Sequence, residues 1–435
     1  MSQHIKSGIT FGIIGGLLTF IFGGWSVLII GILMGVGLGL VLGGRFKRKA
    51  PVLLAREAVP VALVSSGILL AMSLLQNFVI APAIGSVPRD LDVVIPANSI
   101  GVLGGFAMIL VTTALHGLPP KQEQIGKLVI IAVVVVAFPF IDNFTGLRWI
   151  AQVIFALIFV ILGMGLNIVV GYAGLLDLGY AAFFAIGAYT TGILSSPQHN
   201  IYLNFWLCIW ISAAVAAIFG LLLGAPTLPL RGDYLAIVTL GFGEIIRVFI
   251  LNIDAVGGAR GFGGIPKYSS FGWVYFFAIA SIVVVSRIVN SSFGRTLLAV
   301  REDEIAAEAM GVHTTRSKVI SFVISSAMAG VAGGLFAHYL MYIHTNSFTF
   351  LKSIEIIIMI VLGGMGSITG SVVGAVLYIV LTEGLRAFEQ YRMVTFSLLL
   401  VLIMIFRPQG LMGHRELFGR KRREARQPAA PTIEA

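Results

Sequence analysis

Apolar residues in this chain form long, nearly uninterrupted runs, and short segments between them carry most of the charge. A helix of about 20 apolar residues crosses the hydrocarbon core of a bilayer. The pattern predicts spans at 58–83, 98–118, 127–142, 149–170, 178–195, 204–224, 233–252, 271–290, 319–343, 351–365, 369–386 and 392–406. A further run, 7–44, fits either a hairpin of two short helices or one long tilted helix.

The fold class that follows is all-α: a polytopic membrane helix bundle of about 11–14 transmembrane segments. The run at 178–195 is short and rich in glycine, and Gly171 and Gly174 precede it. We expect this segment to be a broken or re-entrant piece of helix.

Composition and charge agree with a membrane location. The chain is 58% hydrophobic and 11% charged, whereas soluble domains carry about 25% charged residues. Most of its 29 lysine and arginine residues lie in 45–57, 119–127, 225–232, 287–318 and 407–435. The positive-inside rule places these segments and the C-terminus in the cytoplasm. The net charge of +10 therefore reflects topology and contact with lipid, and no nucleic acid is expected as a partner.

The sequence lacks the motifs of several nucleotide-binding, metal-binding and catalytic sites. The sequence has no P-loop, HExxH or GxSxG motif. Its single cysteine, Cys208, lies within an apolar run and reads as a small buried side chain. We expect no metal, no cofactor and no ATPase activity of its own.

The cytoplasmic loop 290–318 is predicted to contain a short helix. Three acidic residues (Glu302, Asp303 and Glu304) come first, as a helix dipole favours. An apolar stripe at Ile305, Ala309 and Val312 follows, and Gly311 can cap the end. Ala306 and Ala307 have small side chains, which suit a helix that inserts into a groove. The spacing fits either insertion into the groove of a partner or a surface helix lying on the membrane.

Charges also occur inside predicted spans, where they are costly and mark paths or pairs. Glu244 and Arg247 stand at i and i+3 and are predicted to pair on one face of a helix. Glu355 is a further candidate. Such groups either line a substrate path or form a buried ion pair that locks helices together, and the pattern leaves both open. The glycines at 330, 333, 334, 366, 370 and 374 predict close helix packing.

Five segments resemble, in order, the motifs of branched-chain amino acid ABC permeases. They are GLNIVVGYAGLLDLGYAAFFAIGAY at 165–189, LRGDYLAIVTLGFGEIIR at 230–247, the loop 294–311, VLGGMGS at 361–367 and RPQGL at 407–411. The likeness covers about residues 127–411 and is to the M-type (LivM) subunits. It implies three regions: extra N-terminal helices at 1–120, a permease core at 121–411 and a basic cytoplasmic tail at 412–435.

The resemblance also implies a machine in the bacterial inner membrane. An H-type permease shares the path, cytoplasmic ATP-binding subunits drive it, and a periplasmic substrate-binding protein delivers leucine, isoleucine or valine. Coupling to the ATPase is implied for Arg301, Glu302, Asp303, Glu304, Ala306, Ala307 and Gly311. The chain departs from the general importer signature at Ile305, where a glutamate is expected. Related permeases carry urea or short amides.

Alternating access is the expected mechanism. Polar residues within apolar spans are our candidates for the lining of the path: Asn167, Tyr180, Glu244 and Arg247. A rival hypothesis is an ion-coupled secondary transporter, which would need no partners, although no clear internal repeat supports it. An intramembrane enzyme or a structural membrane protein is a second rival, and it would transport nothing.

Overall fold

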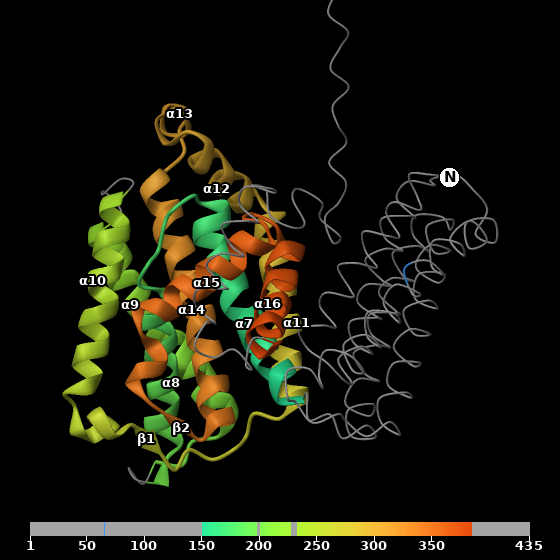
Figure 1. Cartoon of the computed structure of the whole chain (residues 1–435). Helices are drawn as coiled ribbons and strands as arrows, with labels where there is room; N and C mark the ends of the chain where they lie inside the picture. The colour runs from blue at the N-terminus through green and yellow to red at the C-terminus, as the bar shows by residue number, and fades with distance from the viewer. Residues whose placement is uncertain (1–64, 66–149, 198–200, 228–232, 385–435) are drawn as a thin grey trace, which may run out of the picture. The chain divides into compact units, whose positions relative to one another are not determined.

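The structure is a computed structural model that describes residues 65, 150–197, 201–227 and 233–384 (Figure 1). The predicted helices at 7–44, 58–83, 98–118, 127–142 and 392–406 lie outside the described residues, Ser65 excepted. So do the predicted regions 1–120, again except Ser65, and 412–435.

The described residues are almost entirely helical. In chain order the α-helices are α7 (Ile150–Asn167), α8 (Tyr180–Ser195), α9 (Phe205–Thr227), α10 (Asp233–Leu251), α11 (Phe271–Val289), α12 (Ser292–Glu302), α13 (Glu304–Ala309), α14 (Thr314–Leu340), α15 (Phe350–Gly363) and α16 (Ile368–Gly384). A π-helical turn, η2 (Ile168–Tyr172), continues α7. Three 3-10 turns are η4 (Asp254–Val256), η5 (Gly258–Arg260) and η6 (Thr345–Phe348). Strands β1 (Phe262–Gly263) and β2 (Tyr342–Ile343) pair antiparallel, with Phe262 opposite Ile343.

Hydropathy located these helices well. Five described helices are long and apolar enough to cross a membrane: Ile150–Tyr172, Phe205–Pro226, Tyr234–Leu251, Phe271–Val289 and Thr314–Leu340. The multi-pass helical fold is confirmed. Helix α8 has 16 residues and so spans only about 24 Å at 1.5 Å per residue, less than the roughly 30 Å of a hydrocarbon core. The segment predicted at 178–195 is therefore a short helix, and its re-entrant placement stays a prediction. The span predicted at 351–365 is not among the helices long enough to cross, because α15 has only 14 residues.

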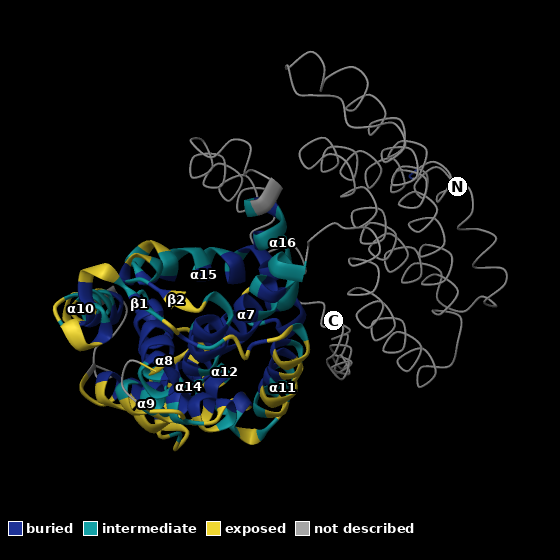
Figure 2. Cartoon of the chain, turned by 90° about the horizontal axis from the view of Figure 1, so that it is seen from below, coloured by how far each residue is buried: buried dark blue, intermediate teal, exposed yellow. Residues whose placement is uncertain are grey.

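Helix α14 lies at the centre of the body formed by residues 151–382, packed against α8 and α9. Figure 2 shows α7, α8 and α14 mostly buried, while α9, α10 and α11 present exposed faces. Glycine allows the closest crossing: a Cβ added at Gly187 of α8 would lie 2.4 Å from the carbonyl oxygen of Gly330 in α14. A side chain at Gly187 would force α8 and α14 apart. A Cβ at Gly330 would instead lie 2.5 Å from the carbonyl oxygen of Ser212 in α9, so the predicted close packing at Gly330 is confirmed against α9.

The two ends of this body differ in chemistry. Helices α12 and α13 lie at one end, and η4, η5 and the β1–β2 pair lie at the other (Figure 1). At the strand end, α9 and α11 begin with aromatic side chains, and the rings of Trp206 and Trp273 are 5.0 Å apart. Tryptophan gathers at the headgroup level of bilayers. The strand end therefore marks one membrane interface, and the charged α12–α13 end lies towards the other.

The crossing of α8 and α14 gives a matched pair of variants. We expect Gly187→Ala to lower the stability of the full-length chain by about 1–3 kcal/mol, because a Cβ there overpacks a backbone contact. Gly241→Ala in α10 meets no atom within 4 Å and should be neutral or stabilising by roughly 0.5–1 kcal/mol, the usual gain for alanine over glycine in a helix. Thermal unfolding of the purified chain in detergent measures both. Equal effects would contradict the close crossing.

Candidate functional site

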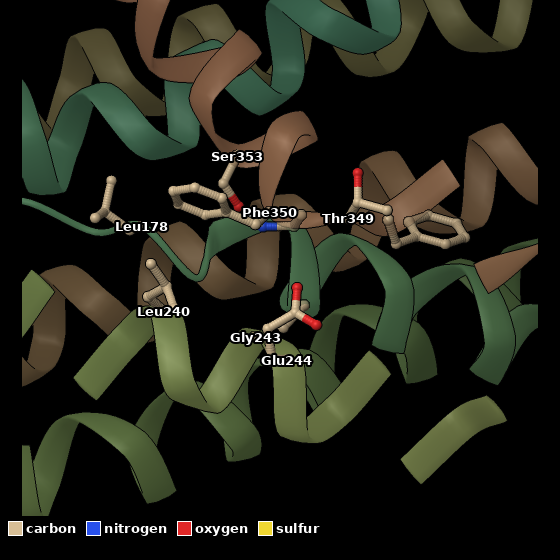
Figure 3. Close-up of a pocket in the computed structure, with 10 residues that line it drawn as sticks. Leu178, Leu240, Gly243, Glu244, Thr349, Phe350 and Ser353 are labelled. Atoms are coloured by element: carbon tan, nitrogen blue, oxygen red, sulfur yellow. Dashed lines mark hydrogen bonds between the residues drawn. The ribbon is translucent and has the colours of Figure 1, made fainter. Parts of the chain in front are cut away.

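A small cleft opens where α8, α10 and α15 meet (Figure 3). Its free volume is small, about 10 Å³, which is enough for roughly one water molecule. Its lining consists of Leu178, Ala181, Ala182, Leu240, Gly243, Glu244, Phe348, Thr349, Phe350 and Ser353. Most of these side chains are apolar, and the single carboxylate among them belongs to Glu244. The cleft is therefore a narrow, mostly apolar gap with one acidic group beside it.

Two helices begin at this cleft. The backbone N–H of Ala181, in the first turn of α8, donates to Ser353 Oγ in the first turn of α15 at 2.9 Å. The chain that leads into α8 is irregular but bonded: Asp177 Oδ1 accepts from the N–H of Gly179 at 2.9 Å, and the N–H of Leu178 donates to Thr239 Oγ1 at 3.0 Å. Irregular backbone is tolerated at membrane depth only where protein or water satisfies it. Here the side chains of Asp177 and Thr239 accept hydrogen bonds from two of the irregular backbone N–H groups.

The predicted pairing of Glu244 with Arg247 is confirmed. Arg247 Nε donates to Glu244 Oε2 at 2.8 Å, and the two side chains remain 28% and 37% exposed, respectively. Exposing a charge to lipid at mid-membrane costs about 2.5–3.5 kcal/mol on insertion scales. The exposed face of α11, by contrast, carries Trp273, Phe276, Ile279, Val283 and Val284. The α11 face suits lipid, whereas the charged part of α10 suits water or another polypeptide.

The loop 290–318 differs from the sequence prediction. In place of one helix that starts at the acidic residues, it forms α12, which ends at Glu302, and the six-residue α13, which starts at Glu304. Asp303 causes the break, because its carboxylate accepts from the N–H groups of Ile305 and Ala306 at 2.9 and 3.0 Å. This is N-capping, for which aspartate is among the preferred residues. Gly311 follows α13 with φ 83° and donates to Glu308 O, as the predicted C-cap requires.

Helix α13 is held to the base of α14 by two contacts. Lys318 of α14 is buried, with a side chain only 3% exposed, and it forms an ion pair with Glu304. Ala307, a residue of α13 itself, is buried. A helix of six residues is unstable by itself, so these contacts and the Asp303 cap fix its position.

The outer side of α13 is uncovered by the described chain and carries apolar side chains beside the exposed Glu308. Ile305 is 66% exposed and Met310 is 85% exposed, with Ala306 and Ala309 exposed beside them. Of the predicted stripe, only Val312 is half-buried. Apolar side chains gathered at a loop tip favour contact with another protein.

Comparison with known proteins decides the family. Residues 149–407 match the family described as branched-chain amino acid transport system / permease component. The chain belongs to this family. The match covers more than half of the sequence, and it takes in the cleft and the α12–α13 loop.

Individual relatives agree with the family. The LivM permease protein of the high-affinity branched-chain amino acid transport system of Salmonella typhimurium is 41% identical over 334 residues, covering 69% of this permease and 77% of the relative. A probable LivM of Methanocaldococcus jannaschii is 25% identical over 317 residues, 60% of this chain and 92% of the relative. The LivH permease protein of Escherichia coli is 32% identical over 148 residues, 33% of this chain and 47% of the relative. No solved structure matches.

Asn167 and Tyr180 lie away from the lining of the cleft. Both are fully buried in this permease. Asn167 bonds the turn between α15 and α16, where its Oδ1 accepts from Gly366 N at 2.9 Å and its Nδ2 donates to Ser367 O at 3.2 Å. The Tyr180 hydroxyl donates to Ser325 O in α14 at 3.2 Å. Their place on the translocation path stays a prediction. Glu355 binds Lys352 and Tyr378 and so joins α15 to α16.

Sequence reasoning missed two long-range contacts. It offered Arg301 and Glu304 as groups for a partner, but Arg301 Nη1 donates to Gly171 O at 2.6 Å and Glu304 pairs with Lys318. These partners stand 130 and 14 residues away in sequence. A signal for the second contact was present: Lys318 falls next to an apolar run, where a buried cation requires a carboxylate.

The Lys318–Glu304 pair predicts an asymmetry between two variants. Glu304→Gln leaves a buried ammonium without its counter-charge, and we expect a cost of about 1–3 kcal/mol at the α13–α14 contact. Lys318→Met leaves the partly exposed Glu304 free to meet water and should cost less. Hydrogen exchange of the α13 amides measures both: faster in Glu304→Gln than in Lys318→Met. The reverse order would show that the pair does not hold the helix.

Proposed function

We propose that this chain is the M-type permease subunit of an ATP-driven importer of leucine, isoleucine and valine in a bacterial inner membrane. Its family and the transport system named for its LivM relatives support this substrate class. The partial likeness to a LivH permease supports a second, homologous permease as its partner. Cytoplasmic ATP-binding subunits and a periplasmic substrate-binding protein complete the proposed complex. The chain itself provides the path and carries no ATPase motif.

The observation that carries the proposal is Glu244 at the edge of an apolar cleft. A branched-chain amino acid is a zwitterion with a small apolar side chain, so a path for it needs apolar walls and a few polar groups. Leu178, Leu240 and Phe350 supply apolar surface, and the Glu244 carboxylate can accept the substrate ammonium. Arg247, bonded to the same carboxylate, holds it in position. Urea and short amides carry no such cation.

The second permease is proposed to cover α10. Its charged pair is poorly suited to lipid, and the cleft lies on the same helix, so a partner there would enclose the path between the two subunits. The exposed side chains Ile237, Ile245 and Phe249 of α10 supply apolar contact surface beside the pair.

The loop 290–318 is proposed to dock on the ATPase. The positive-inside rule puts it in the cytoplasm, together with the C-terminus. Exposed groups that can make the contact include Glu302, Ile305, Ala306, Glu308, Ala309 and Met310. Asp303, Glu304, Ala307 and Gly311 build and hold the helix that presents them. We also propose the division of the sequence into extra helices at 1–120, a core at 121–411 and a tail at 412–435.

Uptake by the reconstituted complex in vesicles tests the function. We expect leucine uptake to require ATP and the ATP-binding subunits. Glu244→Gln should weaken leucine uptake roughly ten- to hundredfold, since a hydrogen bond to a charged group contributes about 1.5–3 kcal/mol. Glu355→Gln is the matched control, because it makes the same change within a helix but at the contact with α16.

Three results would count against the proposal. Normal leucine kinetics in Glu244→Gln would remove that residue from the path. Uptake of urea in preference to leucine would assign the permease to the substrate class of urea and short amides. Gradient-driven uptake by this chain alone would favour a secondary transporter.

A further inference from the structure

Arg301 is an exposed residue in the last turn of α12, and its side chain reaches two other elements of the fold. Its Nη1 donates to Gly171 O in the π-helical turn η2 at 2.6 Å. Its aliphatic part lies on Gly174, where an added Cβ would come within 2.9 Å of Arg301 Cγ. A cation at the carbonyl end of a helix is favoured by the helix dipole, and a charged donor makes a stronger hydrogen bond than a neutral one.

A third element meets the other two at this place. The turn between α15 and α16 brings Gly366 close: a Cβ there would lie 3.0 Å from Arg301 Nη1 and 3.1 Å from Gly171 O. Asn167, one residue before η2, binds both Gly366 N and Ser367 O. We call Arg301, Asn167, Gly171, Gly174 and Gly366 the Arg301 junction. It joins the cytoplasmic loop, the end of α7 and the α15–α16 turn.

Two elements of the junction lead directly to the cleft. The chain after η2 runs through Gly174 to Leu178, a lining residue, and then into α8. Helix α15 ends at the Gly366 turn and starts at Phe350, with Thr349, Phe350 and Ser353 in the lining. A displacement of α12 would therefore pull on both of these walls. Single π-helical turns such as η2 occur frequently at functional sites, because they place backbone carbonyls outside the regular ladder.

We propose that Arg301 is a positioning residue of the transport cycle, which transmits movement of the α12–α13 loop to the walls of the cleft. This inference rests on the proposed function and assigns Arg301 a role inside the permease, distinct from contact with the ATPase. Helix α13 receives the push of the ATPase, and the Arg301 junction passes it to η2 and the α15–α16 turn. Lysine is an incomplete substitute, because its single ammonium lacks the planar fork of donors that a guanidinium carries.

The experiment compares Arg301→Met with wild type in the reconstituted complex. Methionine keeps the aliphatic contact with Gly174 and removes the guanidinium. We expect assembly and ATP hydrolysis close to wild type, but leucine transported per ATP to fall about tenfold, the change expected when a hydrogen bond to a charged group is lost. Arg301→Lys should recover part of the coupling. Arg295→Met, also on α12 and exposed, should behave as wild type.

Two results would overturn the inference. One is a wild-type transport-to-hydrolysis ratio in Arg301→Met. The other is a loss of assembly or of ATP hydrolysis in Arg301→Met that matches the loss of uptake, as an ATPase contact would give. If Arg301→Met does not yield folded protein, Arg301→Gln is measured in the same way, with the same two outcomes.

A second readout needs no transported substrate and so separates this inference from the proposed function. Hydrogen exchange is followed at 171–179 and 349–353 in the wild-type complex with and without a non-hydrolysable ATP analogue. We expect the analogue to change exchange in wild type and Arg295→Met, and to leave it unchanged in Arg301→Met. An equal response in Arg301→Met, or none in wild type, would overturn the inference. Absence of ATP-driven leucine uptake by wild type would overturn only the proposed function.

Discussion

A peptide backbone that leaves the helical path inside a bilayer must find its hydrogen bonds within the protein, because the lipid offers none. The rest of this structure depends on how the chain meets that constraint at two interruptions, one before α8 and one between α15 and α16. Asp177 and Thr239 bond the chain that leads into α8, and Ser353 of α15 accepts from the first turn of α8. At the other end of α15, the amide of Asn167 serves the turn into α16. The two interruptions can therefore lie in the core, because the backbone N–H groups of Leu178, Gly179, Ala181 and Gly366 all have side-chain acceptors.

The same interruptions create the functional geometry. Two shortened helices that start side by side leave room for a cleft, which two unbroken spans would fill with side chains. Glycine makes the arrangement compact: Gly187 of α8 and Gly333 of α14 let these two helices cross in contact, so the α8 side of the cleft is tightly packed. The opposite side is α10, whose Glu244–Arg247 pair is poorly placed for lipid. The fold thus places a charged pair beside the cleft, where the proposed second subunit would cover it.

The sequence was sufficient for features that depend on local pattern and insufficient for those that depend on distant contacts. Hydropathy located the described spans, and an i, i+3 spacing predicted the Glu244–Arg247 pair, because both follow from the geometry of one helix. The break at Asp303 was missed because three consecutive acids fit a helix start as well as they fit a helix end followed by a cap. The bond from Arg301 to Gly171 joins residues 130 positions apart, and no periodicity reports such a contact. The roles in transport remain proposals, since they concern partners as much as this chain.

The most direct measurement is hydrogen exchange at Gly366 in the full-length permease carrying Asn167→Leu, a substitution of similar size that removes both side-chain hydrogen bonds. Asn290→Leu, at the exposed end of α11, is the control. If polar side chains hold the interrupted backbone in place, the Gly366 amide exchanges much faster in Asn167→Leu and is unaffected in Asn290→Leu. Unchanged exchange at Gly366 in Asn167→Leu would contradict the account.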